Sequence, residues 1–121
     1  SGVRLCFYLN QVPFLAGARR SAQEWIFPGG ASDNRLHFGP GVRFDPAIDE
    51  SEQMLLFDPQ TSGGLLLCVP PERLPQMHQR AAELGQALWE VGEALAAPAG
   101  GEALDAPAGG EAGWRIEVVK G

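Results

Sequence analysis

A short polar segment between two apolar runs carries the residues best suited to chemistry in this chain. Asp58-Pro59 can start a turn, because the residue before a proline avoids the helical region and an Asp side chain can bond the backbone that follows. Gln60, Thr61 and Ser62 then offer one amide and two hydroxyls. Gly63-Gly64 can take a positive φ and let the backbone approach another group. This inventory suits phosphate or ribose oxygens, and the alternative of a self-satisfied turn before a buried strand stays open.

Other residue types capable of chemistry are scattered. His37 and His78 lie far apart, and neither has neighbours at the spacing of a metal site. Four acidic residues fall between positions 45 and 52, namely Asp45, Asp49, Glu50 and Glu52. Magnesium sites of phosphoryl-transfer enzymes use one or two carboxylates on rigid elements, so a solvated acidic surface is favoured here. Ser62 lacks the Gly-x-Ser-x-Gly frame of a serine nucleophile.

Size and composition indicate one globular domain over residues 1–121. With 45% hydrophobic and 20% charged residues, the chain has the composition of a soluble protein, and no apolar run approaches the roughly 18 residues of a membrane helix. The chain shows no signal peptide, so we expect a cytoplasmic protein. A net charge of −6 disfavours a nucleic-acid partner, because such binding needs clustered Lys and Arg. Cys6 and Cys68 each lie in an apolar run and are predicted to be core residues of strands.

Periodicity in the first half predicts a strand, a helix and a turn-rich stretch. Residues 3–9 alternate as a strand, and a helix with its apolar stripe between Leu15 and Trp25 is expected after a cap at Asn10. Pro28-Gly29-Gly30 should end that helix and open a loop to residue 34, followed by short strands at 35–38 and 42–44. A short helix is expected within residues 50–57.

The second half predicts three strands, a helix and an inserted repeat. Residues 65–69 form a continuous apolar run, typical of a buried strand. A helix should begin at Pro71 and stop at Gly85, followed by strands at 87–91 and 114–119. Between the last two strands the unit Gly-Glu-Ala-Leu-x-Ala-Pro-Ala-Gly occurs twice and begins a third time. We interpret about residues 93–113 as a low-complexity hairpin insertion.

Four segments resemble one enzyme family. The string Asp58-Pro59-Gln60-Thr61-Ser62-Gly63-Gly64-Leu65-Leu66 resembles the signature of the C-terminal domain of selenophosphate synthase (selenide, water dikinase), in the AIR synthase-related superfamily. Residues 12–18 and 27–34 are similar to the family's Pro-containing Gly-Ala segment and to its Pro-Gly-Gly followed by Asn. Residues 89–93 fall where the family has an apolar pair before Gly-Glu. The order holds from about Ser1 to Leu95, most of the chain.

The resemblance implies an α+β fold, a mixed β-sheet of four or more strands with at least two helices packed on it. It also implies a fragment of an enzyme that converts selenide, ATP and water to selenophosphate, AMP and phosphate. ATP and Mg²⁺ would be bound mainly by an absent N-terminal domain, which also forms the homodimer, so no catalytic residue or metal site is expected in this chain. The loop facing the substrate would comprise Asp58, Gln60, Thr61, Ser62, Gly63 and Gly64. A second loop would add Gly29, Gly30 and Asn34.

Two other functions remain open at this point. Within the superfamily, the chain could be the C-terminal domain of an AIR synthase, a thiamine-monophosphate kinase or a hydrogenase maturation protein, although the intact Asp-Pro-Gln-Thr-Ser-Gly-Gly string argues against these. From another class, it could be a stand-alone, non-catalytic binding module. The redox Cys of the family lies in a Gly-rich segment beside a Lys, a context that neither Cys6 nor Cys68 has.

Overall fold

The computed structural model describes residues 2–96 and 115–121, and its centre is a four-stranded mixed sheet. The strands are β1 (Val3–Tyr8), β2 (Val42–Phe44), β3 (Gly92–Ala96) and β4 (Ile116–Val119), in the order β2-β4-β1-β3. β4 runs parallel to both β1 and β2, and β3 runs antiparallel to β1. The predicted α+β fold with a mixed sheet is therefore confirmed.

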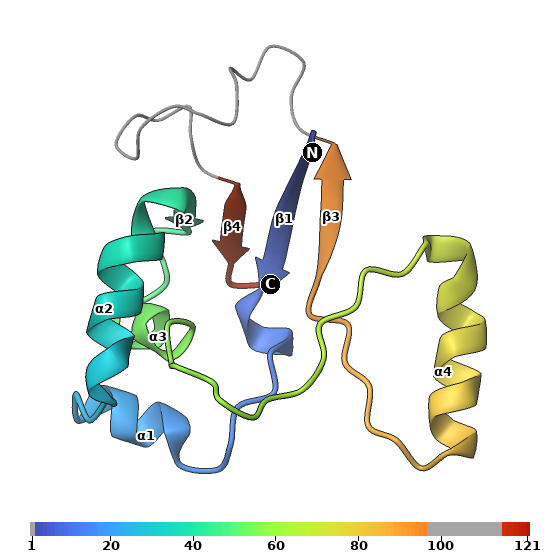
Figure 1. Cartoon of the computed structure of the whole chain (residues 1–121), viewed down its shortest axis with the longest axis horizontal. Coiled ribbons are helices and arrows are strands. Elements are labelled where there is room, and N and C mark those ends of the chain that lie inside the picture. Colours follow the sequence, from blue (N-terminus) through green and yellow to red (C-terminus); the bar gives the residue numbers. More distant parts are fainter. Residues whose placement is uncertain (1, 97–114) are drawn as a thin grey trace.

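Helices lie on two sides of this sheet. α1 (Ala18–Gln23), α2 (Gly29–Phe38) and α3 (Glu50–Leu55) gather beside β2 and β4, whereas α4 (Leu74–Glu83) stands apart beyond β3 (Figure 1). Short 3-10 turns occur at η1 (Leu9–Gln11), η2 (Gly39–Gly41) and η3 (Pro71–Arg73). None of the helices in the described ranges is long and apolar enough to cross a membrane.

The core lies between the sheet and the first three helices. Leu9, Ile48 and Val118 are almost fully buried and form its centre, and residues of β1, β2 and β4 pack around them. Alternation in the strands explains this arrangement, because Phe7 pairs in register with Val118 and Val118 with Phe44, so the three side chains share one face. The predicted strand at residues 3–9 and the strand at 42–44 are confirmed, and Cys6 is buried in β1 as expected.

The stretch predicted as a loop at 29–34 and a strand at 35–38 is one helix, α2, so both predictions were wrong. No β-branched residue occurs from Gly29 to Phe38, and Ala31 is fully buried, which lets tertiary packing override the two glycines. Asn10 was wrongly predicted to cap α1, since it lies in η1. Gly17 holds the cap position instead, with a φ of 88° that a glycine accommodates easily.

The prediction of a buried strand at residues 65–69 was wrong. These residues form no strand, Leu65 is 89% exposed, and Cys68 is exposed rather than in the core. The strand predicted at 87–91 was also wrong, because the edge strand β3 begins only at Gly92. A continuous apolar run predicts that a segment is buried, but it does not identify the element that covers it. In this fold the position beside β1 is occupied by β4, which lies near the C-terminus.

Two elements near the C-terminus match the sequence more closely. The helix after Pro71 is confirmed as η3 followed by α4, and Gly85 ends it with a φ of 62°. The last strand is confirmed as β4, although residue 114 lies outside the described residues. Of the predicted insertion, residues 93–96 lie in β3 and 97–113 lie outside the described residues. β3 and β4 do not form a hairpin, since each pairs with β1 instead.

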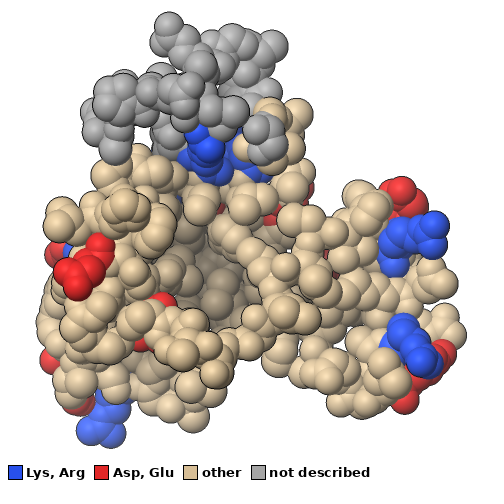
Figure 2. All heavy atoms as spheres, viewed as in Figure 1, with Lys and Arg blue, Asp and Glu red and all other residues tan. Residues whose placement is uncertain are grey.

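One face of the molecule has a depression near its centre. Figure 2 shows a central depression between the α1–α3 side and the α4 side, surrounded mostly by uncharged residues. On the α4 side, the charged atoms visible in this view gather along the right-hand margin, away from the depression.

Candidate functional site

The predicted substrate loop begins directly after Phe57, which is buried behind α3. Asp58 is half-buried, and Gln60 donates a hydrogen bond from Nε2 to Oδ2 of Asp58. Thr61, Ser62, Gly63 and Gly64 follow as exposed residues without regular secondary structure. The first half of the loop is thus a compact turn with an internal bond, and the second half presents its polar groups to solvent.

The structure brings the two predicted segments together. Asn34 of α2 donates from Nδ2 to the carbonyl oxygen of Phe57 at 2.9 Å, which ties the helix to the residue just before Asp58. A Cβ atom at Gly30 would lie 3.2 Å from Cγ of Pro59, tighter than ordinary packing. With any larger residue at position 30, the Pro59 ring would have to shift by a few tenths of an ångström, so glycine favours this close approach of α2 to the loop. Gly30 and Asn34 therefore position the Asp58–Gly64 loop, whereas a Cβ at Gly29 would meet open space.

The glycines at the end of the loop do not use their conformational freedom. Neither Gly63 nor Gly64 has a positive φ. A Cβ at Gly63 would be in ordinary contact with the Gln60 side chain at 3.6 Å, and one at Gly64 would contact nothing. The loop does not depend on glycine-only backbone angles at these two positions.

A hollow of about 830 Å³ opens beside the first turn of α2. Its walls come from the segment after α1, from α2, from β2 and from α3, and they include Trp25, Phe27, Gly29, Ser32, Arg35 and Phe57. Trp25 is 56% exposed and has a φ of 56°, which is unusual for a non-glycine residue. Of the predicted site residues only Gly29 lines this hollow. Trp25 was expected on the apolar stripe of a helix, whereas the structure places it after α1 at the wall of this hollow.

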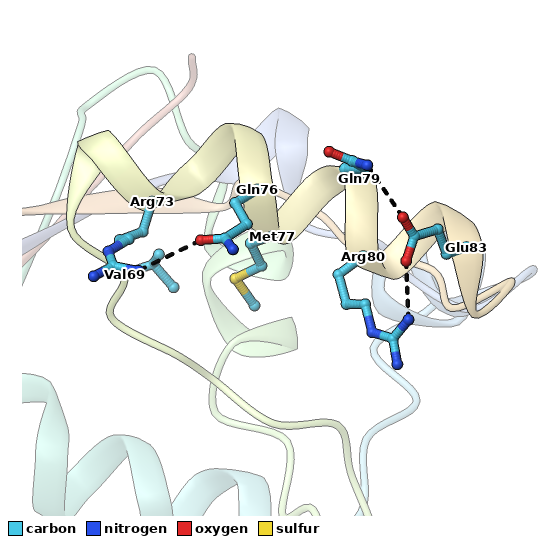
Figure 3. Close-up of a pocket in the computed structure, with 7 residues that line it drawn as sticks. All are labelled: Val69, Arg73, Gln76, Met77, Gln79, Arg80 and Glu83. Carbon is cyan, nitrogen blue, oxygen red and sulfur yellow. Dashed lines mark hydrogen bonds and ion pairs between the residues drawn. The ribbon is translucent and has the colours of Figure 1, made fainter.

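A second hollow, of about 710 Å³, runs along α4 and contains none of the predicted site residues. Figure 3 shows Val69 and Met77 beside a row of polar side chains that bond to one another. Arg73 donates to Gln76 at 3.4 Å, and Glu83 accepts from Gln79 at 3.1 Å and from Arg80 at 2.9 Å. The charges on this side of α4 are largely matched within the helix itself.

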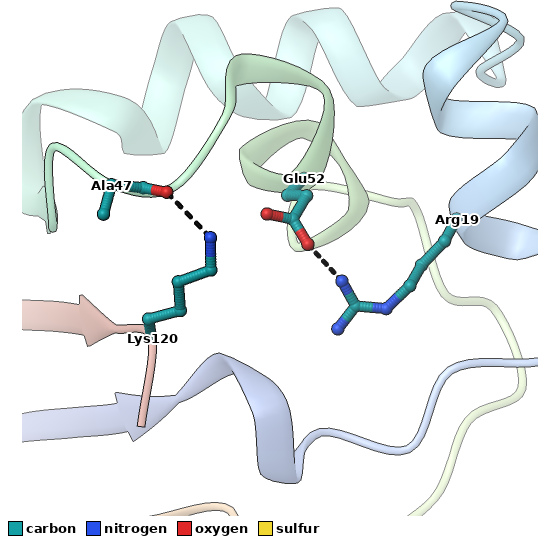
Figure 4. Close-up of polar contacts among 4 residues, drawn as sticks. All are labelled: Arg19, Ala47, Glu52 and Lys120. Carbon is teal, nitrogen blue, oxygen red and sulfur yellow. Dashed lines mark hydrogen bonds and ion pairs between the residues drawn. The ribbon is translucent and has the colours of Figure 1, made fainter.

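Three of the four acidic residues between positions 45 and 52 take part in structural contacts. Glu52 of α3 pairs with Arg19 of α1, and Lys120 donates from Nζ to the Ala47 carbonyl at 3.1 Å (Figure 4). Glu50 pairs with Arg35 of α2 at 2.6 Å, and Asp45 accepts from the Ala47 amide at 2.8 Å. Within residues 2–96 and 115–121 no group of three or more His, Cys, Asp or Glu side chains is placed to hold a metal ion.

Two ionisable groups on β1 have shifted pKa values. Burial, together with the nearby carboxylates of Glu117 and Glu93, raises the pKa of the Cys6 thiol above its ordinary value of 9.0. Tyr8 donates its hydroxyl hydrogen to Glu93, and this bond raises the pKa of the phenol above 10.0. Both groups are held in their protonated forms, and neither lies in the predicted loop.

Comparison with known proteins identifies relatives of the chain. No family model matches it. A selenide, water dikinase from Carboxydothermus hydrogenoformans is 36% identical over 85 residues, which are 70% of this chain and 25% of that protein. The Pseudomonas aeruginosa selenide, water dikinase is 43% identical over 82 residues, 68% of this chain and 23% of the relative. The Pasteurella multocida protein of the same name is 34% identical over 96 residues, 79% of this chain and 26% of the relative.

These matches confirm the resemblance seen in the sequence. The chain is homologous to one segment of the selenide, water dikinases, and it spans about a quarter of the length of the curated relatives it matches. That share is consistent with one domain of a longer protein. All three relatives carry the same name, so the other superfamily enzymes are not favoured.

Proposed function

We propose that this chain is the C-terminal domain of an ATP-dependent selenophosphate synthase, which converts selenide, ATP and water to selenophosphate, AMP and phosphate. The observation that carries this proposal is an identity of 34–43% with selenide, water dikinases over 66–83% of the chain. In this proposal the catalytic residues belong to the rest of the enzyme. The domain closes the active site from one side.

The wall toward the substrate is formed by the loop Asp58, Gln60, Thr61, Ser62, Gly63 and Gly64, supported by Gly30 and Asn34, with Gly29 beside them at the start of α2. The bond from Asn34 to Phe57 and the contact of Gly30 with Pro59 support this assignment, because they hold the loop against a helix rather than leaving it free. The hydroxyls of Thr61 and Ser62 are exposed and can donate to phosphate oxygens. Enclosing the reacting groups would exclude water that competes for the phosphoryl group.

Among the described residues, no group of three or more His, Cys, Asp or Glu side chains is placed to hold Mg²⁺. Glu50 and Glu52 are paired with arginines, and Asp45 bonds the backbone. In phosphoryl transfer, positioning and charge neutralisation supply most of the catalysis, and this requires cations and carboxylates free to bind. We therefore assign ATP and Mg²⁺ to the N-terminal domain, which we also propose as the homodimer contact. A cytoplasmic location stays a prediction that cell fractionation would test.

The decisive experiment replaces both hydroxyls of the loop in the longer enzyme. Thr61→Ala with Ser62→Ala removes two donors without adding bulk, so the melting temperature should stay within about 2 °C of wild type. Turnover of selenide-dependent AMP formation should fall about tenfold for each 1.4 kcal/mol of lost transition-state contact. Ser51→Ala is the matched control, since it removes a hydroxyl from α3 outside the loop.

Unchanged turnover in the double variant would show that the loop is only architectural. A parallel fall of turnover and melting temperature would lead to the same conclusion. The isolated 121-residue chain should form no AMP from ATP and selenide, because the proposal places the ATP and Mg²⁺ sites in the rest of the enzyme. Selenide-dependent AMP formation by this chain alone would contradict the division of roles.

A further inference from the structure

Asp58 carries the one charge of its region of the chain. It is the only charged residue between Glu52 and Glu72, and it is half-buried, whereas residues 59–64 that follow it are exposed. The reactants of the proposed reaction, selenide and the phosphates of ATP, are anions. A carboxylate in a wall that faces anions repels them, with an energy that falls as its distance from them grows. The placement of this carboxylate therefore affects how well the loop can receive its substrate.

The backbone of Asp58 is held on both sides by α2. The residue before it, Phe57, accepts at its carbonyl oxygen the 2.9 Å hydrogen bond from Asn34. The residue after it, Pro59, packs against Gly30, where an added Cβ would lie 3.2 Å from the Pro59 Cγ atom. The proline ring also fixes its own φ and restricts the residue before it. Little backbone freedom is left at Asp58.

The side chain of Asp58 is held by Gln60. The Nε2 atom of Gln60 donates a hydrogen bond to Oδ2 of Asp58. The other end of the same amide reaches toward Gly63, because an added Cβ there would lie 3.6 Å from Oε1 of Gln60. A hydrogen bond to an ionised acceptor is stronger than one between neutral groups. Gln60 thus supplies a donor for the carboxylate without adding a charge of its own.

We propose that Gln60 is a positioning residue that holds the Asp58 carboxylate at the half-buried start of the loop. The exposed hydroxyls of Thr61 and Ser62 can then receive an anion with this negative charge kept in a fixed place. Without the bond the carboxylate is free to turn toward the exposed half of the loop and repel the substrate. This role rests on the proposed function, and Gln60 acts in it through Asp58 rather than by touching the substrate.

Salt dependence of the KM for selenide in the longer enzyme tests this role. At low ionic strength Gln60→Ala should raise the KM about fivefold over wild type, through repulsion by one displaced charge, with kcat nearly unchanged. At about 0.5 M salt the ratio of the two KM values should fall below about two, because salt screens exposed charges. Gln79→Ala is the matched control, since Gln79 donates to the Glu83 carboxylate at 3.1 Å on α4, and its KM should equal that of wild type.

A double-mutant cycle shows whether Gln60 acts through Asp58. Asp58→Asn removes the charge and should lower the KM for selenide. In that background Gln60→Ala should change the KM by less than about twofold, because the two residues act as one unit. Gln60 is exposed, so the melting temperature of Gln60→Ala should stay within about 2 °C of wild type.

Three results would overturn the role given to Gln60 while the wild-type enzyme remains active. They are a KM defect in Gln60→Ala that salt does not reduce, an equal defect with and without the Asp58 charge, and a higher KM in Asp58→Asn. The last result would mean that the carboxylate itself binds the substrate. A wild-type enzyme that forms no AMP in response to selenide would instead contradict the proposed function, and the role of Gln60 with it.

Discussion

The Nδ2 atom of Asn34 lies 2.9 Å from the carbonyl oxygen of Phe57, and this bond joins α2 to the start of the Asp58–Gly64 loop. The two residues are 23 positions apart in sequence. The Phe57 carbonyl follows the end of α3 and has no helical hydrogen-bond partner, and the Asn34 side chain of α2 donates to it instead. The orientation of the loop is consequently set by one amide group on α2.

Removing that amide should loosen the loop and cost stability. We expect Asn34→Ala to lower the free energy of unfolding by about 1 kcal/mol, since a partly buried carbonyl would lose its partner. Urea unfolding measures this change. Asn10→Ala is the control, because the Asn10 side chain is exposed and should matter by less than about 0.5 kcal/mol. Equal effects of the two changes would contradict the role given to Asn34.

Leu9 should be one of the most sensitive core positions. It is fully buried at the centre of the core, so Leu9→Ala should cost about 2–5 kcal/mol through lost burial and the cavity left behind. Leu15→Ala serves as the control, because Leu15 is 87% exposed. Thermal and urea unfolding of the two variants compare them. A small loss for Leu9→Ala would mean that the core is centred elsewhere.

Gly92 should tolerate no side chain. A Cβ atom there would overlap the carbonyl oxygen of Cys6 on the neighbouring strand. The nearest atoms all belong to the backbone of Cys6 and Phe7, so no flexible side chain can move aside to make room. We expect Gly92→Ala to cost about 1–3 kcal/mol or to separate β3 from β1. Gly41→Ala is the matched control, because an added Cβ at Gly41 meets nothing within 4 Å and its φ is not positive. Amide hydrogen exchange in β3 would report separation of the strands.

The two thiols should differ strongly in reactivity. Cys68 is exposed, whereas Cys6 is buried and its pKa is raised, so little thiolate forms at neutral pH. In the folded chain a thiol reagent should modify Cys68 at least tenfold faster than Cys6. Cys68→Ser should leave a single slow thiol that becomes fast in urea. Two equally fast thiols in the native protein would be inconsistent with a buried Cys6.

The bond between Tyr8 and Glu93 should make the fold sensitive to high pH. Because the folded-state pKa of Tyr8 is raised above the unfolded value of about 10, the fold favours the protonated phenol. This contribution is fully present below pH 10 and is lost as the pH rises through the raised pKa. The free energy of unfolding should therefore fall more steeply above pH 10 in wild type than in Tyr8→Phe. Parallel pH profiles would show that the bond does not form in solution.

Sequence patterns predicted the elements with a clear period and failed where burial depends on distant partners. The strand at residues 3–9 alternates, and the helix after Pro71 has a proline start and a glycine stop, so local physics suffices for both. α2 contains two glycines and no strong apolar stripe, and it exists because Ala31 packs in the interior. Leu65–Val69 has the composition of a core strand, yet the position beside β1 belongs to β4.

The candidate site was predictable in composition and not in arrangement. The polar residues from Asp58 to Ser62 stand out in the sequence, and so does Asn34 after the glycine pair. That Asn34 bonds the Phe57 carbonyl, and that Gly30 leaves room for Pro59, depends on how α2 and α3 cross. No local pattern encodes such a crossing.

The sheet order also bears on how the repeated nine-residue unit could change in number. In a hairpin the length of the turn determines which residues of the two strands face each other. β3 and β4 lie on opposite sides of β1; β3 is aligned by β1, and β4 is aligned by β1 and β2. Residues gained or lost between them shift neither alignment, and doubling such a connection costs only about 0.6 kcal/mol. Gene replication errors that add or remove a unit would accordingly be nearly silent for folding.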